Sequence, residues 1–246
     1  MANRQVTTVP RIFDDEFEPL ADELLRSYFS NADGGSSGFT GSHFETLSGV
    51  WDAAETSNVI TAGDLAAVSC LSVNIPGRAA VRILQSQADE ITALLAAMPN
   101  VTKPLWATAD EDLTSKSAAA QELWKLLRSG GDGMGPVTTS KLMARKRAHL
   151  IPIYDTVVAS ALKRSNSAGF WATVRPLMQA EVDGLPLHSR LANSAARVGL
   201  PKAVTPLRVF DVVVWYSHNP RQRSSVDAIQ ERLIENGMMK KRWRPS

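Results

Sequence analysis

Apolar residues recur at three- and four-residue intervals along most of the chain, and this spacing constrains the fold more than any other feature. Phe17, Leu20 and Leu24 are one example. Such spacing places the side chains on one face of a helix, whereas a strand needs strict alternation. The pattern predicts helices over 13–29, 60–72, 78–98, 112–127, 137–147, 155–163, 170–181, 187–198, 205–218 and 224–236. Ile151–Tyr154 could pass for a strand but is short and isolated, so we predict an all-α fold.

Two helix starts are marked by capping residues. Thr61 can accept a hydrogen bond at the start of its helix, and Asp64, three residues later, suits the positive end of the helix dipole. Thr205 provides a capping hydroxyl and Pro206 follows at the first helical position, where its missing N–H costs nothing. These signals place the starts of two helices within a residue or two.

The length of 246 residues allows one large domain or two lobes that share a core. We expect a flexible arm at 1–12, one two-lobed helical domain at 13–237 and a basic tail at 238–246. Cys70 is the single cysteine, which excludes an internal disulfide and a cysteine-ligated cluster, and we expect no disulfide-linked partner. No signal peptide or membrane span is visible, so we expect a cytoplasmic protein without a membrane partner.

Charge is unevenly distributed although the net charge is only +2. Residues 1–60 carry ten acidic and three basic residues, whereas 140–164 carry six basic residues and one acidic residue. The tail adds four positive charges between Lys240 and Arg244. A local basic patch can attract phosphates even in a nearly neutral protein, but the same clusters could be solvated helix faces. Both interpretations stay open on charge alone.

The most specific signal is a glycine bend between two predicted helices, Gly133-Met134-Gly135-Pro136-Val137-Thr138-Thr139. Glycines permit positive φ and the close approach of another backbone. Pro136 can open the second helix, whose first amides then point outward at the positive end of the helix dipole. Such a helix start is a ready site for a phosphate of a nucleic-acid backbone. The alternative is a tight interhelical turn with glycine as the helix C-cap.

This stretch resembles the hairpin of the helix-hairpin-helix DNA glycosylase superfamily, whose pattern is Gly-hydrophobic-Gly-x-x-Thr-Ala. Thr139 replaces the small alanine. In the superfamily an aspartate opens the next helix, and here Asp155 stands in that place, twenty residues after Gly135. The resemblance covers about residues 117–165, with the helix-hairpin-helix element at 117–147. The whole chain is also similar to a bacterial domain family of unknown function, in segments such as Phe39–Gly41 and Lys141–Arg147.

The resemblance implies a DNA-binding repair enzyme, a hydrolase that removes a flipped base with Asp155 as the catalytic carboxylate. The residues that it assigns to DNA binding are Gly133, Gly135, Val137, Thr138, Lys141, Arg145, Lys146 and Arg147. Some members form a Schiff base through a lysine two residues after the last glycine of the hairpin. Val137 occupies that position, and nothing in the sequence aims Lys141, one turn further on, inward. The resemblance therefore implies a glycosylase without lyase activity.

Other interpretations remain open. Asp155 could simply cap its helix by accepting from the amides of Val157 or Val158. Asp211 lies in an apolar run, where it could pair with Arg208 or act as a pocket acid with a raised pKa. Tyr154 and His43 are further candidate pocket residues.

No spacing of the four histidines suggests a metal, and no nucleotide or cofactor motif occurs, so we expect no cofactor. Two alternatives to a glycosylase follow. One is a non-catalytic module that binds DNA or protein. The other is an enzyme that acts on something other than DNA, with Asp211 or His43 in its pocket.

Overall fold

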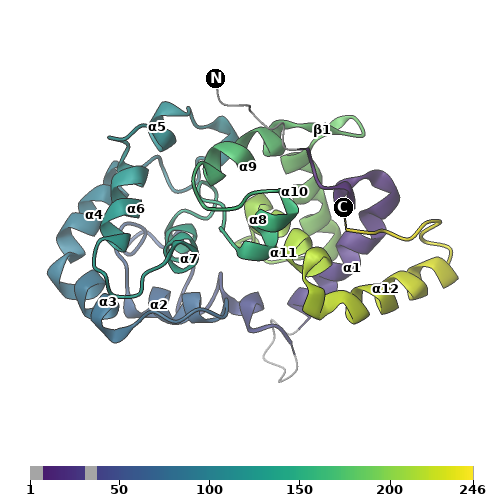
Figure 1. Ribbon diagram of the computed structural model, residues 1–246, viewed down its shortest axis with the longest axis horizontal. Helices are drawn as coiled ribbons and strands as arrows, with labels where there is room; N and C mark the ends of the chain where they lie inside the picture. The colour runs from purple at the N-terminus through teal and green to yellow at the C-terminus, as the bar shows by residue number, and fades with distance from the viewer. Residues whose placement is uncertain (1–7, 31–37, 246) are drawn as a thin grey trace.

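The helices begin and end largely where the sequence provides caps. The computed structural model describes residues 8–30 and 38–245. Within these ranges one short hairpin provides the only strands and the other regular elements are helices, which confirms the predicted all-α class (Figure 1). The helices are α1 (Glu18–Phe29), α2 (Ala62–Ser69), α3 (Gly77–Val81), α4 (Ala88–Ala97), α5 (Glu111–Thr114), α6 (Ala119–Arg128), α7 (Pro136–Lys146), α8 (Thr156–Ala161), α9 (Phe170–Gln179), α10 (Leu187–Val198), α11 (Pro206–His218) and α12 (Arg223–Glu235).

The predicted caps are present. Thr61 and Asp64 form a reciprocal capping box at α2, in which the Asp64 carboxylate also accepts from the Thr61 amide at 2.9 Å. At α11, Thr205 accepts from the amide of Arg208, and Pro206 is the first residue of the helix. At α8, Asp155 accepts from the amide of Val157 at 2.9 Å. Side-chain chemistry thus fixes the starts of three helices around the candidate site.

Two predicted helices are interrupted. The segment predicted at 78–98 contains a π-helical turn at Arg82–Ser86, where the amide of Gln87 donates to the carbonyl of Arg82. The segment predicted at 112–127 breaks after α5, where Ser115 is extended. Periodicity does not reveal either break, because the apolar spacing continues across it.

A two-stranded hairpin, β1 (Glu181–Val182) with β2 (Leu185–Pro186), replaces the predicted end of the helix at 170–181. Asp183 and Gly184 both have positive φ, at 48° and 82°. This is the backbone geometry that an Asp-Gly hairpin turn adopts, so the dipeptide was a local signal for the hairpin.

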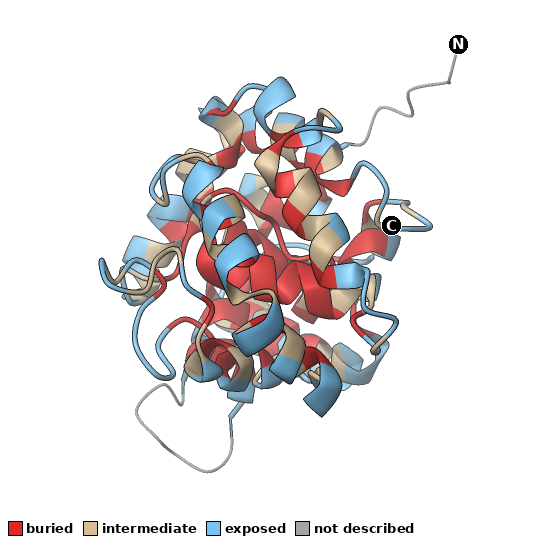
Figure 2. Cartoon of the chain, turned by 90° about the vertical axis from the view of Figure 1, so that its left-hand side faces the viewer, coloured by how far each residue is buried: buried red, intermediate tan, exposed pale blue. Residues whose placement is uncertain are grey.

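The helices pack as two lobes around a continuous core. In the first lobe α7 packs against α2 and α6, and α6 packs against α4. In the second lobe α11 packs against α1, α8, α10 and α12. One cluster of buried apolar side chains extends through both lobes. Figure 2 shows buried residues concentrated in the inner helices and exposed residues on their outer faces. The segment between α7 and α8 joins the lobes and thereby positions the candidate site.

Both ends of the described chain are packed more closely than predicted. Ile12, assigned to a flexible arm at 1–12, is 0% exposed within a short 3-10 turn, so that boundary is wrong for Ile12. Residues 1–7 of that arm lie outside the described residues. In the predicted tail, Trp243 is buried against His218 and its amide donates to Gln230 at 2.7 Å. In the part of the chain that the structure describes, no helix is long and apolar enough to cross a bilayer.

Candidate functional site

A pocket of about 160 Å³ lies where the two lobes meet. Its charged residues come from three elements: Lys141 from α7, Asp155 from the start of α8, and Arg208 and Asp211 from α11. Its remaining lining residues are Tyr28, Phe39, Thr40, Gly41, Cys70, Leu71, Ser72, Ile153, Val212 and Trp215. Sequence segments from both halves of the chain therefore contribute to one site.

Asp155 lines this pocket and also caps α8. Its Oδ1 accepts from the Val157 amide at 2.9 Å, and its Oδ2 lies 3.6 Å from Nζ of Lys141. The side chain is 16% exposed. The predicted capping role is therefore confirmed, and the cap fixes the direction of the carboxylate at the pocket. The predicted catalytic role remains a prediction.

Lys141 points into the pocket, a direction for which the sequence holds no signal. Its Nζ donates to the carbonyl of Leu71 at 2.8 Å and faces the Asp155 carboxylate. Burial lowers the pKa of the Lys141 ammonium, and the charge of Asp155 opposes that shift. The reason for its orientation is the packing of α7, which is buried from Thr138 to Lys146 between α2, α6 and the pocket. This packing directs the Lys141 side chain inward.

Arg208 organises the opposite wall. Its Nη1 lies 2.5 Å from Oδ2 of Asp211, and its Nη2 donates to the hydroxyl of Tyr28 at 3.0 Å and to the carbonyl of Gly41 at 2.8 Å. Its Nε lies 2.7 Å from Oε1 of Glu45 as an ion pair. Burial raises the pKa of the Glu45 carboxyl, and Arg208 counteracts that shift. The predicted pairing of Asp211 with Arg208 is thus confirmed.

Asp211 also has the raised pKa of a pocket acid. Burial raises the pKa of its carboxyl to about 6, the charge of Arg208 opposes this shift, and the charge of Asp155 adds to it. Both predicted descriptions of Asp211, salt-bridge partner and pocket acid, therefore apply to the same residue. The pocket combines two carboxylates, one of which holds a proton up to near-neutral pH. A buried carboxyl with a raised pKa beside a second carboxylate is an arrangement found in acid–base sites.

Aromatic rings form the side of the pocket next to these charges. Tyr28 and Phe39 stack nearly parallel with their centroids 4.9 Å apart, and Phe39 meets Trp215 edge-to-face at 5.8 Å. A planar group entering the pocket would meet ring surface on this side and charged groups on the other. Neither Tyr28 nor Trp215 is among the candidate residues singled out from the sequence, because neither carries a motif.

Two of the candidate pocket residues lie elsewhere. Tyr154 is buried and lines a different cavity, on the other side of the segment that joins α7 to α8. His43 ends a short 3-10 turn, Thr40–His43, and is not among the residues that line the pocket. Adjacent positions in an extended segment point to opposite sides, which separates Tyr154 from Asp155.

The glycine bend lies at the surface between α6 and α7. Gly130, Gly131 and Gly133 are exposed, and Gly133 has φ of +90°. The amide of Gly135 donates to the carbonyl of Gly133 at 2.9 Å, so this predicted phosphate donor is engaged within the bend. No backbone partner within the described residues accepts from the amides of Val137 and Thr138 at the start of α7. Neither amide thus has a backbone acceptor at the positive end of the helix, where Val137 is half-buried and Thr138 is buried.

Arg82 anchors the bend to the first lobe. It pairs with Asp132 at 2.7 Å and donates to the carbonyls of Leu126 and Leu127 at the end of α6. The guanidinium thus satisfies carbonyls that a helix end leaves without partners. The buried contacts of the Arg82 side chain consequently hold the bend in place while its glycines stay at the surface.

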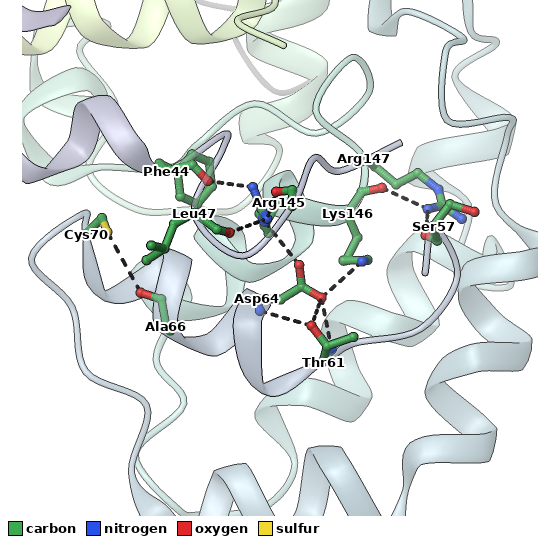
Figure 3. A network of polar contacts seen from close by, with 11 residues as sticks. Phe44, Leu47, Ser57, Thr61, Asp64, Ala66, Cys70, Arg145, Lys146 and Arg147 are labelled. Carbon is green, nitrogen blue, oxygen red and sulfur yellow. Dashed lines mark hydrogen bonds and ion pairs between the residues drawn. The ribbon is translucent and has the colours of Figure 1, made fainter. Parts of the chain in front are cut away.

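The predicted DNA-binding role of the basic residues in and after α7 is wrong. Arg145 donates to the Asp64 carboxylate at 3.0 Å and to the carbonyls of Phe44, Leu47 and Gly49, and it is 2% exposed (Figure 3). These partners engage all three nitrogens of its guanidinium, and its burial keeps the group away from a DNA phosphate.

The side chains of Lys146 and Arg147 are likewise buried and bonded within the protein. Nζ of Lys146 donates to Asp64 at 3.0 Å (Figure 3). Arg147 donates to the carbonyls of Ser57 and Leu95, and burial lowers its pKa to about 10. Together with the inward-facing Lys141, these basic residues tie α7 to α2 and to the chain before and after it. None of the four is placed to contact a DNA backbone.

Comparison with known proteins identifies one family. The model of a family described as a family of unknown function (DUF6308) matches residues 21–218. No curated protein and no solved structure matches the chain.

Proposed function

The chain belongs to this family of unknown function, and we propose that it hydrolyses an N-glycosidic bond, with a DNA base as the leaving group. One observation carries the proposal: two carboxylates, Asp155 and Asp211, face a pocket with an aromatic wall, and burial raises the pKa of the Asp211 carboxyl. Cleavage of an N-glycosidic bond needs stabilisation of positive charge on the sugar and a proton for the departing base. The pair supplies a group for each task.

Asp155 is the carboxylate for the sugar. Its cap on α8 and its ion pair with Lys141 fix its direction, so that it stabilises the oxocarbenium-like charge or orients a water. Asp211 gives its proton to the base nitrogen as the bond from that nitrogen to C1′ breaks. Water adds to C1′, and its proton returns to the carboxylates. The extruded base lies against the aromatic side of the pocket, which Tyr28, Phe39 and Trp215 form.

The glycine bend supports DNA as the substrate. The amides of Val137 and Thr138, which lack a backbone acceptor at the positive end of α7, suit one backbone phosphate. Since the basic side chains of α7 are buried, the protein should make few contacts with DNA phosphates, and its affinity for DNA should be modest. Because Val137 occupies the imine-forming position of the related enzymes, we assign Lys141 to positioning Asp155 and propose hydrolysis without strand cleavage.

Substitution of Asp155 tests the activity. Duplexes with deaminated, alkylated or oxidised bases are incubated with the protein and then treated with alkali to reveal abasic sites. Asp155→Asn keeps a good helix cap, so the fold should persist while base release falls on the order of 100-fold. Asp89→Asn, an exposed position in the first turn of α4, is the matched control and should retain full activity. Undiminished base release by Asp155→Asn would contradict the proposal.

A non-catalytic DNA-binding module is the second candidate. It is favoured by the engagement of both Asp155 oxygens, one by the Val157 amide and one by Lys141. This candidate predicts binding of a duplex that weakens as salt rises, no abasic product from any substrate, and equal affinity for the protein and its Asp155→Asn variant. The two candidates differ in product, so the same duplexes decide between them.

A further inference from the structure

A second cavity, of about 430 Å³, lies beside the glycine bend. It is larger than the pocket at Asp155 and falls within the roughly 300–1,000 Å³ of small-molecule sites. Its lining includes Gln121, Trp124 and Arg128 of α6, Tyr154 of the segment before α8, and Phe170 and Trp171 at the start of α9. Neither the sequence analysis nor the function proposed above uses this cavity.

Four aromatic side chains dominate the lining. Trp124 and Trp171 meet at 85° with centroids 5.9 Å apart, and Tyr154 and Phe170 also meet at 85°, with centroids 5.2 Å apart. In an edge-to-face pair one ring face is left uncovered by its partner. The cavity therefore offers ring surface to a flat ligand.

Arg128 adds a fixed positive charge to this lining. Its guanidinium lies 5.4 Å from the ring centroid of Trp124. The residue is exposed, and it forms no ion pair or hydrogen bond with any residue in 8–30 or 38–245. Stacking on Trp124 limits its freedom, so a ligand anion would meet a cation that is already in place.

Gln121 provides a polar contact further in. Its Nε2 donates to the carbonyl of Leu113 at 3.0 Å, which fixes the amide and leaves its Oε1 as an acceptor. The cavity thus combines flat apolar surface, one oriented acceptor and one unpaired cation. A planar heteroaromatic ring that carries N–H groups and an anionic substituent matches all three.

We propose that this cavity binds a nucleotide, with the base among the aromatic rings and the phosphate at Arg128. The nucleotide is either free or an unpaired unit of a DNA strand. The second source is suggested by position, because Arg128 ends α6 directly before the bend. The site does not depend on Asp155, which faces the other pocket. It is therefore a binding site separate from the proposed chemistry.

Tryptophan fluorescence tests the site with AMP, adenosine and inorganic phosphate as probes. AMP should quench the fluorescence saturably, adenosine should bind more weakly, and phosphate alone should not displace AMP at equal concentration. Arg128→Ala should weaken AMP binding about tenfold and leave adenosine unchanged. Lys125→Ala is the matched control, since Lys125 is exposed on the same helix and pairs with Glu122; it should bind AMP normally.

Trp124→Leu provides a second variant, checked for folding by circular dichroism. It should weaken both AMP and adenosine, since base stacking on an aromatic ring is lost. AMP affinity unchanged in Arg128→Ala, or an absence of AMP binding, would overturn the inference. Displacement of AMP by an equal concentration of phosphate would do the same, because it would assign the binding to the anion alone.

Oligonucleotides distinguish a free nucleotide from an unpaired unit of a DNA strand as the ligand. The binding test is also independent of the base-release experiment. If the nucleotide belongs to a strand, a thymidine tetranucleotide should bind more tightly than AMP, and an abasic tetramer of equal length should not. If AMP binds more tightly, the free nucleotide is the ligand. Asp155→Asn should bind AMP normally. Loss of AMP binding with base release intact defeats only this inference, and AMP binding without base release defeats only the proposed function.

Discussion

At the scale of the residue, Asp211 connects the stability of the protein to pH. It is 6% exposed, and burial raises the pKa of its carboxyl from 3.8 to about 6 although Arg208 lies against it. A carboxyl whose pKa is higher in the folded than in the unfolded state favours folding in its protonated form. Its contribution is therefore fully present below pH 3.8 and is lost as pH rises through 6.

Asp211→Asn removes this titration, because asparagine stays neutral. The difference in melting temperature between the wild type and Asp211→Asn should change between pH 4 and pH 7. The melting temperature of the wild type should fall relative to that of the variant as pH rises. Base release by the wild type should decline over the same range, since the protonated carboxyl is the proposed acid. A difference in melting temperature that is constant over this range would show that the Asp211 carboxyl titrates normally.

For single residues, the sequence indicated the ion-pair partner of a side chain better than the direction in which a side chain points. The pairing of Asp211 with Arg208 follows from adjacency in a helix that must be buried. The inward direction of Lys141 depends on which face of α7 meets α2, and that packing involves residues about 70 positions away, such as Leu71. A single sequence holds no local signal for such a contact.

At the scale of the element, the bend between α6 and α7 depends on Gly133. Its φ of +90° lies in a region that side chains disfavour, and a Cβ at this position would lie 2.9 Å from Cγ of Pro76. Gly133→Ala should therefore lower the free energy of unfolding by about 1–3 kcal/mol. Urea denaturation measures this change.

Gly77→Ala is the matched control for that measurement. A Cβ there meets nothing within 4 Å, and its φ is outside the positive range. The control should change the free energy of unfolding by less than about 0.5 kcal/mol. Equal effects of the two substitutions would mean that the bend is not strained by a side chain.

Helix starts were predictable and helix interruptions were not. Thr61, Asp155 and Thr205 carry capping chemistry in the sequence itself, and each caps a helix. The π-turn at Arg82–Ser86 has no such marker. There the side chain of Arg82 reaches the end of α6 and Asp132, a tertiary contact that overrides the apolar periodicity.

At the scale of the whole molecule, Asp64 holds distant segments together. It accepts from Arg145 and Lys146 of α7 while capping α2, and Arg145 in turn binds three carbonyls of the loop before α2 (Figure 3). Asp64→Asn removes the one carboxylate that Arg145 and Lys146 share. Breaking a buried ion pair from one side typically costs about 3–5 kcal/mol, so we expect a loss of that size in urea denaturation.

Asp112→Asn serves as the control for this prediction because Asp112 is exposed in the first turn of α5. It should leave the unfolding midpoint nearly unchanged. If Asp64→Asn were equally mild, the two cations would have to find other acceptors, and the network would not stabilise the lobe.

The withdrawal of positive charge into the protein has a consequence for its denatured state. Residues 141–147 hold Lys141, Arg145, Lys146 and Arg147, all of which fold into the interior. An unfolded chain exposes them to solvent together. Heparin or another polyanion would then bind the denatured chain better than the native one, and by mass action it would act as a denaturant of this protein.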